Sequence, residues 1–230
     1  MSNHHHEHHN ASPAGLRDFV IGMSDGLTVP FALAAGLAGA VDTTTLIVTA
    51  GVAEIAAGAI AMGLGGYLGA KTEKEHYDAE RKREFREVEC VPHVEAKECA
   101  DILVEFGVPE DKVAAVVEGI QRNPTKWVDF MMRFELGLEN PDPSRLYKSP
   151  LIIGGAYVLG GTLPLIPYIL IPDPMEALVV SSAVSLVALF AFGAFKGYFT
   201  GQKMLKSALQ TTAIGAAAAI AAFSIAGLIS

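Results

Sequence analysis

The 230-residue chain is 51% hydrophobic and carries 17 Lys+Arg against 25 Asp+Glu, a formal net charge of −8. This acidic balance argues against nucleic acid as a partner and favours cations. The charged residues are unevenly placed: Lys71–Lys148 holds 13 of the basic and 18 of the acidic residues, whereas the rest of the chain holds only 4 and 7. Such segregation predicts a membrane protein with one soluble insertion.

The first segment in chain order is a His-rich N-terminus, residues 1–15, which we expect to be flexible. Its run His4-His5-His6-Glu7-His8-His9 is either a tag remnant or a native metal-sequestering tail, and we assign it no function. We expect no cleavable signal peptide, because the start is polar and the first apolar run is long enough to span a membrane.

Five hydrophobic stretches follow, two within residues 16–70 and three within residues 149–230. Each is at least 22 residues long, against roughly 20 needed for a ~30 Å hydrocarbon layer, and each must be helical to satisfy its backbone in lipid. The predicted fold class is therefore all-α, a polytopic membrane protein with five transmembrane helices and a three- to four-helix cytosolic insertion. A four-span arrangement with a peripheral last segment is the alternative. The predicted spans are Leu16–Ala40, Thr44–Ala70, Pro150–Ile171, Met175–Gly201 and Ser207–Ile229.

The placement of basic residues predicts the orientation. If the N-terminus is cytosolic, the far-side connections 41–43 and 172–174 contain no Lys or Arg, and all 17 basic residues fall on the near side. By the positive-inside rule, the N-terminus and residues 71–148 are cytosolic and the C-terminus lies on the opposite side.

The insertion, residues 71–148, reads as a helical domain. Its helices are expected at about 72–89, 93–106, 109–122 and 124–138, separated by Pro and Gly residues. The first should continue the second span without a break, because neither Gly nor Pro follows Gly69 for more than 20 residues. Cys90 and Cys99 are expected to be free thiols facing a reducing cytosol.

Carboxylates and methionines recur at helical spacing in this insertion. Together they are compatible with a divalent-cation site, to which the sulfurs would add a preference for Fe²⁺ and softer ions. The same spacing equally fits solvated acidic faces and a Met-aromatic core, and this reading is the more favoured on spacing alone. The residues concerned are Glu80, Glu84 and Glu87, then Glu95 and Glu98, then Met131, Met132 and Glu135.

Two acids lie inside the predicted spans. Asp25 falls in the first, and Glu54 falls in the second, where Met62 follows two turns later. A carboxylate at membrane depth is costly and marks a functional site, and no Lys or Arg lies at similar depth to pair with either acid. Metal and protons would compete for such a site, which is the physical basis of antiport. Met62 alone reads more readily as lipid-facing or core filler.

The runs that hold these acids, Asp18–Phe31 and Glu54–Gly63, resemble the signatures of the vacuolar iron transporter family, plant type. The resemblance extends from about Leu16 through the whole chain. It implies a homodimer with a pore between subunits and Fe²⁺/H⁺ exchange from the cytosol into the vacuole, in a secondary transporter rather than an enzyme. Mn²⁺, Co²⁺, Ni²⁺ and Zn²⁺ are possible secondary substrates.

Residue by residue, the resemblance assigns Asp25, Glu54 and Met62 to the translocation site. It assigns a cytosolic metal-binding role to Glu84, Glu87, Glu95, Glu98, Met131, Met132 and Glu135. The alternative function is a membrane-anchored iron-binding or ferroxidase protein whose insertion is the active part. Glu73-x-x-His76 is half of a di-iron signature, but the sequence lacks the second Glu-x-x-His that such a centre needs.

Overall fold

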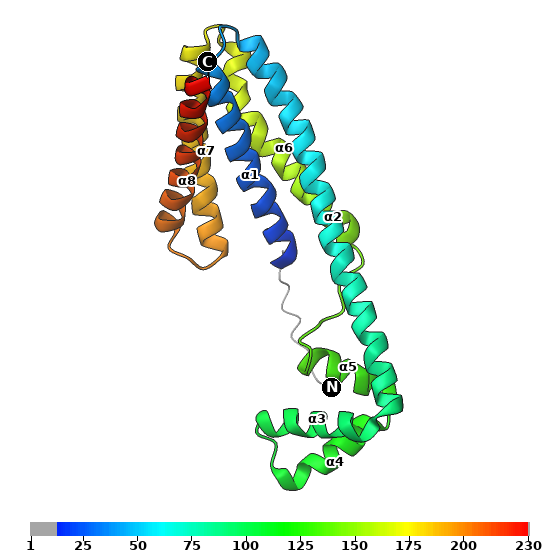
Figure 1. The fold of residues 1–230 in the computed structure, drawn as a ribbon. Coiled ribbons are helices and arrows are strands. Elements are labelled where there is room, and N and C mark those ends of the chain that lie inside the picture. Colours follow the sequence, from blue (N-terminus) through cyan, green and yellow to red (C-terminus); the bar gives the residue numbers. More distant parts are fainter. Residues whose placement is uncertain (1–12, 230) are drawn as a thin grey trace, which may run out of the picture. The chain divides into compact units, whose positions relative to one another are not determined.

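The computed structural model describes residues 13–229, so the His-rich run of the N-terminus lies outside the described residues. The described chain is all-helical, as predicted, and its eight helices are shown in Figure 1. Their bounds are α1 Pro13–Ala38, α2 Thr44–Cys90, α3 Pro92–Glu105, α4 Glu110–Gln121, α5 Pro124–Phe134, α6 Arg145–Leu170, α7 Pro174–Phe199 and α8 Met204–Ile229.

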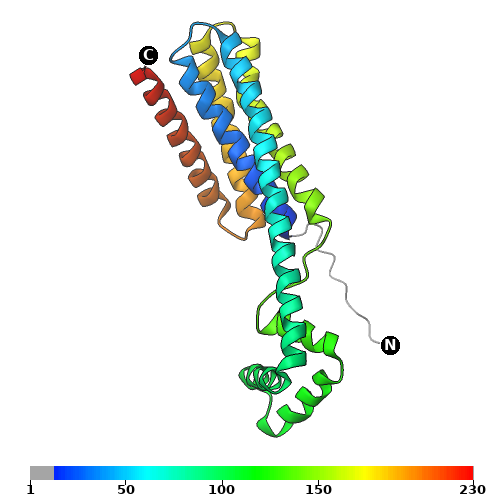
Figure 2. The same cartoon turned by 45° about the vertical axis from the view of Figure 1, so that its right-hand side comes forward.

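Five helices are long and apolar enough to cross a membrane: α1, α2, α6, α7 and α8. These are the five segments predicted from hydrophobicity. The four-span alternative is not supported, because α8 packs against α1 and α7 rather than standing apart. Figure 1 shows α7 and α8 side by side, and in Figure 2 the two helices lie together near the orange turn that joins them and diverge toward the C-terminus.

The chain divides into two compact units. The membrane unit comprises the described residues up to Tyr67 and those from Leu146 onward, and the insertion domain comprises Leu68–Arg145. Helix α2 belongs to both, because it runs for 47 residues without interruption. The predicted continuity after Gly69 is therefore confirmed, and its cause is the absence of any helix-breaking residue before Pro92.

Within the membrane unit, close approach between helices depends on glycine. A Cβ on Gly22 of α1 would overlap the backbone of Ile153 in α6, and one on Gly26 would overlap the backbone of Tyr157. On the other side of α6, a Cβ on Gly58 of α2 would lie 2.5 Å from the Tyr157 hydroxyl oxygen. Helix α6 therefore packs against α1 and α2 at nearly backbone-to-backbone distance, as small residues allow in membrane helices.

The insertion domain has its own hydrophobic core. Buried residues of α2, α3, α4 and α5 meet there, including Tyr77, Cys99, Val117 and Trp127. Helix α5 begins at Pro124, where the side chain of Asn123 caps the helix by accepting a hydrogen bond from the Lys126 amide (3.2 Å). These contacts give the domain a packed interior independent of the spans.

One boundary in this domain differs from the prediction. Helix α5 ends at Phe134 rather than near residue 138. The chain turns at Gly137, whose φ of +64° lies in the left-handed region that glycine adopts without strain. The turn leaves Glu135 at the helix end instead of inside a continuing helix.

Candidate metal sites

The membrane unit contains both acids that the sequence placed in the spans. Asp25 lies on α1, and Glu54 and Met62 lie on α2; all three are partly exposed in the single chain. A third residue, Tyr157 of α6, contacts one of these acids. The Tyr157 hydroxyl donates a 2.5 Å hydrogen bond to Glu54 Oε1.

Tyr157 is held in this position by its neighbours. Its side chain is 3% exposed, and the ring fits against the open face of Gly58. Gly26 lets α1 approach the backbone of Tyr157 on the other side, next to Asp25. The two glycines therefore set how closely α1 and α2 approach Tyr157, whose hydroxyl bonds Glu54.

Glu54 keeps one oxygen unused. While Oε1 accepts the bond from Tyr157, Oε2 is buried and has no hydrogen-bond partner. A buried carboxylate oxygen without a donor is unfavourable by about 1–3 kcal/mol, and more when charged. This atom is suited to take a proton or to coordinate a cation.

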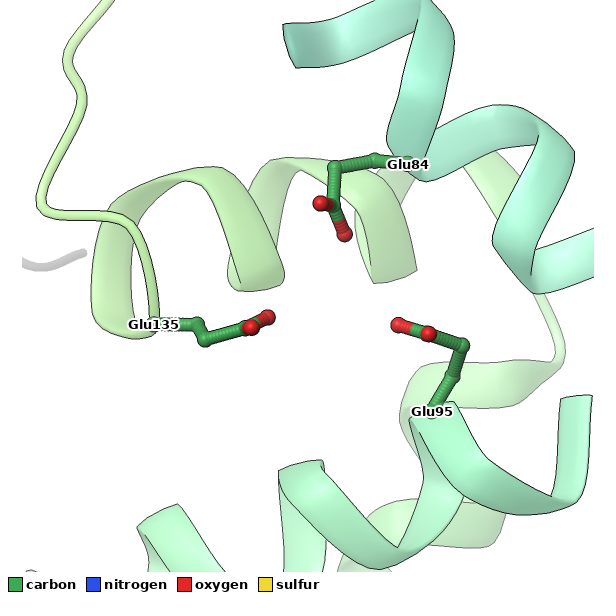
Figure 3. A group of neighbouring side chains, drawn as sticks. All are labelled: Glu84, Glu95 and Glu135. Atoms are coloured by element: carbon green, nitrogen blue, oxygen red, sulfur yellow. The ribbon is translucent and has the colours of Figure 1, made fainter. Parts of the chain in front are cut away.

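The insertion domain contains a second group of acids. Glu84 of α2, Glu95 of α3 and Glu135 at the end of α5 each place one carboxylate oxygen within 4.8 Å of the others. Figure 3 shows the three side chains pointing toward one another. Glu84 and Glu95 are buried, and each keeps one buried oxygen without a hydrogen-bond partner. Oxygen ligands of this kind suit a divalent cation.

The connections between helices bring this carboxylate cluster together. Only Val91 separates α2 from α3, and Pro92 begins α3. The short junction turns the chain back so that Glu95 comes to lie beside Glu84. Glu135 joins from α5 because that helix ends at the cluster rather than extending past it.

Crowding of acids perturbs their protonation. Burial raises the pKa of Glu95 to about 7, and the negative charges of Glu98, Glu84 and Glu87 add to the shift. Burial likewise raises the pKa of Glu135 to about 7, with further contributions from Glu84 and Glu98. Near neutral pH these groups are therefore partly protonated, and a bound cation would favour the charged forms.

The other residues predicted as ligands of the insertion domain lie outside this group of three. Glu87 and Glu98 are outside the group of three, although their charges act on Glu95. Met131 and Met132 are buried in the core of the insertion domain, at 0% and 1% exposure. The Cys99 thiol donates to the Met131 Sδ at 3.2 Å, which fixes that thioether. Burial raises the pKa of Cys99 to about 11, so the thiol is neutral.

Sequence reasoning missed two residues that the structure places at these sites. Tyr157 was not considered, although a tyrosine near the middle of a span, close to Gly154 and Gly160, is a usable signal. The sequence pattern does not single out Arg83 either, yet its guanidinium contacts three carboxylates of α2. Both cysteines are free, as predicted; Cys90 is exposed, but Cys99 is buried.

Comparison with known proteins gives consistent matches. The model of the VIT family matches residues 16–227. The chain is 54% identical to "Vacuolar iron transporter 1" of Arabidopsis thaliana, over 100% of this chain and 92% of that protein. It is 53% identical to "Vacuolar iron transporter 1" of Oryza sativa subsp. japonica, over 98% and 90%. It is 40% identical to "Protein CCC1" of Saccharomyces cerevisiae, over 93% and 69%.

Proposed function

The chain belongs to the VIT family, and we propose that it is a proton-coupled antiporter that moves Fe²⁺ from the cytosol into the vacuole. It is a transporter rather than an enzyme, with iron as its substrate, in accord with the names of the relatives that match nearly its whole length. We place it in the vacuolar membrane, with the N-terminus and residues 71–148 in the cytosol and the C-terminus in the lumen.

The observation that carries the proposal is the state of Glu54. One of its oxygens is held by Tyr157 and the other is buried without a partner. At membrane depth an uncompensated charge is costly, so this carboxylate needs either a proton or a cation. We assign Asp25, Glu54 and Met62 as ligands of the translocated ion, and Tyr157 as the group that orients Glu54.

Exchange of Fe²⁺ for protons follows because both compete for the same carboxylates. Cytosolic Fe²⁺ binds when the carboxylates release their protons, and an acidic lumen returns the protons and displaces the metal. Each unit of pH difference across the membrane supplies about 1.4 kcal/mol per proton. No residue other than the carboxylates has to change its charge in this cycle.

We further propose that the transporter is a homodimer with the pore between subunits. Asp25, Glu54 and Met62 are only partly buried within one chain. Carboxylates at this depth are not expected to face lipid, so a second copy that covers them would complete the cavity. In detergent, we expect light scattering to report a protein mass of two 24.2 kDa chains; a monomer that still transports would overturn this part.

The insertion domain is proposed to collect metal. Glu84, Glu95 and Glu135 supply a preformed group of oxygens, and Glu87, Glu98, Met131 and Met132 are assigned as the surrounding ligands. The sulfurs would favour Fe²⁺ over Mg²⁺ and Ca²⁺, and they would admit Mn²⁺, Co²⁺, Ni²⁺ or Zn²⁺ as secondary substrates. The ferroxidase alternative is disfavoured, because the group found among the described residues contains no histidine and His76 is paired with Glu80 at 3.9 Å.

The test is Fe²⁺ uptake into proteoliposomes with an acidic interior. We expect uptake against the iron gradient only while the proton gradient persists, with concurrent proton release to the outside. Collapsing the gradient with a protonophore should stop it. Equal uptake with and without a pH gradient would contradict the antiport mechanism, and uptake only down the iron gradient would indicate a channel.

A further inference from the structure

Arg83 occupies an unusual position on α2. Its Nη2 atom lies 2.8 Å from Glu80 Oε2 and 3.4 Å from Glu84 Oε1, and its Nε atom lies 3.5 Å from Glu87 Oε2. One guanidinium group therefore contacts three carboxylates of the same helix. A planar guanidinium with several donors is suited to bridge acids in this way.

The other Lys and Arg side chains that form ion pairs in the described insertion domain each contact a single acid outside the carboxylate cluster. Examples are Lys74 with Asp78, Arg122 with Glu118 and Arg145 with Glu73. By contrast, a partner of Arg83, Glu84, belongs to the cluster, and the positive charge of Arg83 also acts on Glu135. Arg83 is thus part of the electrostatic environment of the site.

The position of Arg83 has opposite effects on the empty and the loaded cluster. Without metal, the guanidinium offsets the mutual repulsion of closely spaced carboxylates. With a divalent ion bound, the same guanidinium is a like charge beside it and holds Glu84 Oε1 at the same time. The two like charges repel each other, and partial hydration of the site weakens this repulsion without abolishing it.

We propose that Arg83 is a resident counter-cation that competes with metal for the carboxylates of the insertion domain and thereby keeps their metal affinity low. The inference rests on the proposed metal binding at Glu84, Glu95 and Glu135. Arg83 acts as a positioning residue rather than a ligand. A collector needs this property, because a cluster of unopposed carboxylates would hold the ion instead of releasing it.

The side chain of Arg83 can yield to an incoming ion. It is 43% exposed, whereas the Glu84 side chain is 1% exposed. When a cation enters, the guanidinium can turn toward solvent while Glu84 stays in place. The cluster therefore exchanges one positive partner for another.

The chain contains its own fluorescent reporter of metal binding at the insertion domain. Trp127 is the single tryptophan, and it is buried in the insertion-domain core on the same helix as Met131 and Met132. Quenching of its fluorescence by Co²⁺, titrated into the full-length protein in detergent at pH 8, reports binding at this domain rather than in the membrane.

We expect Arg83→Gln to bind Co²⁺ about tenfold more tightly than the unsubstituted protein, because one positive charge beside a divalent ion is removed. Arg83→Lys keeps the charge and should remain within about threefold. The matched control Arg122→Gln removes the same charge from α4, where Arg122 contacts Glu118, and should change affinity less than twofold. A purely structural role for Arg83 would instead give weaker binding in the Gln variant.

Unchanged or weaker binding by Arg83→Gln overturns the proposal. If the Gln variant does not fold, Arg83→Leu replaces it in the test. This variant keeps an apolar side chain, removes the charge and should also bind Co²⁺ more tightly than the unsubstituted protein. Glu84→Gln separates this inference from the proposed function. If Glu84→Gln leaves Co²⁺ binding intact, the metal site itself is wrong; if it weakens binding while Arg83→Gln does not tighten it, only the role of Arg83 is wrong.

Discussion

The membrane site and the carboxylate cluster of the insertion domain both gather acids, but their surroundings differ. Glu54 has a tyrosine hydroxyl as its partner and, among residues 13–229, forms no ion pair with a basic residue. By contrast, Glu84 lies against Arg83 and among several further acids. The first arrangement leaves a carboxylate that only a proton or an ion can neutralise. The second holds its own positive charge. If the two sites work as proposed, the protein compensates charge at the site that collects the ion and leaves it uncompensated at the site that exchanges the ion for protons.

The largest effect should come from the membrane acid. Glu54→Gln removes the charge that the ion must meet, and we expect proteoliposome Fe²⁺ uptake to fall at least about a hundredfold, equivalent to roughly 2.7 kcal/mol. Asp25→Asn should behave alike. The control is Glu176→Gln in the first turn of α7, an exposed acid that should leave uptake unchanged. If the Glu54 variant takes up Fe²⁺ at the wild-type rate, Glu54 is not needed for transport and the contrast drawn between the two sites is wrong.

Close packing around Tyr157 gives the next effect. In Gly58→Ala the new methyl group would lie 2.5 Å from the Tyr157 hydroxyl oxygen, so the ring must move away from Glu54. We expect uptake to fall about twentyfold and stability by about 1–3 kcal/mol, as for other overpacked sites. Gly65→Ala is the matched control on the same helix, because no atom lies within 4 Å of its Cβ position. Equal losses in both variants would refute the packing argument.

Removal of the Tyr157 hydroxyl alone should lower uptake less than Gly58→Ala does. Tyr157→Phe keeps the ring against Gly58 of α2 but leaves Glu54 Oε1 without its donor. We expect uptake to fall about tenfold, in line with a lost hydrogen bond to a charged group. Tyr198→Phe, at an exposed tyrosine of α7, is the control. Unchanged Fe²⁺ uptake by Tyr157→Phe would show that Glu54 does not need this hydrogen bond to be positioned.

In the insertion domain, loss of an acid should change affinity rather than turnover. For Glu95→Gln we expect the KM for Fe²⁺ to rise about fivefold with kcat nearly unchanged, because the proposed role of the domain is to supply the ion and not to translocate it. Glu110→Gln in the first turn of α4 is the control. A fall in kcat as large as that of the Glu54 variant would remove the functional difference between the sites.

The smallest effect concerns pH. Because Glu95 and Glu135 have pKa values of about 7 in the folded domain, raised from 4.5, the folded state binds more protons than the unfolded state between these values. The metal-free domain should therefore become less stable as pH rises from 5 to 8, and metal should restore stability at the upper end. Thermal unfolding followed by Trp127 fluorescence measures both trends; rising stability with pH without metal would contradict the raised pKa values.

The spans and the continuity of α2 could be predicted because each depends on local composition. Hydrophobic length marks a span, and an uninterrupted run without Gly or Pro keeps α2 helical past Gly69. Asp25 and Glu54 could be singled out because a charge inside a span is rare. The end of α5 was missed because the left-handed turn at Gly137 competes with a helical pattern that continues past it.

The contacts at the sites could not be predicted in the same way. The bond from Tyr157 to Glu54 joins residues 103 positions apart, and no periodicity within one helix encodes such a pair. The role of Arg83 depends on which neighbours are buried: its spacing from Glu80 and Glu87 is that of an ordinary solvated ion-pair face. Burial of Glu84 and the arrival of Glu95 and Glu135 from other helices change that reading.

The glycine contacts of α6 also determine what the membrane unit presents to its surroundings. With main chain against main chain inside, bulky residues such as Leu151, Leu170 and Val187 point outward, at 75%, 74% and 70% exposure. Large apolar side chains therefore cover the outside of the membrane unit, where a water-soluble protein would carry polar ones. The helices associate through close van der Waals packing rather than through the hydrophobic effect. Detergent or lipid is therefore a structural component of the purified protein, and stripping it should cause aggregation before any helix unwinds.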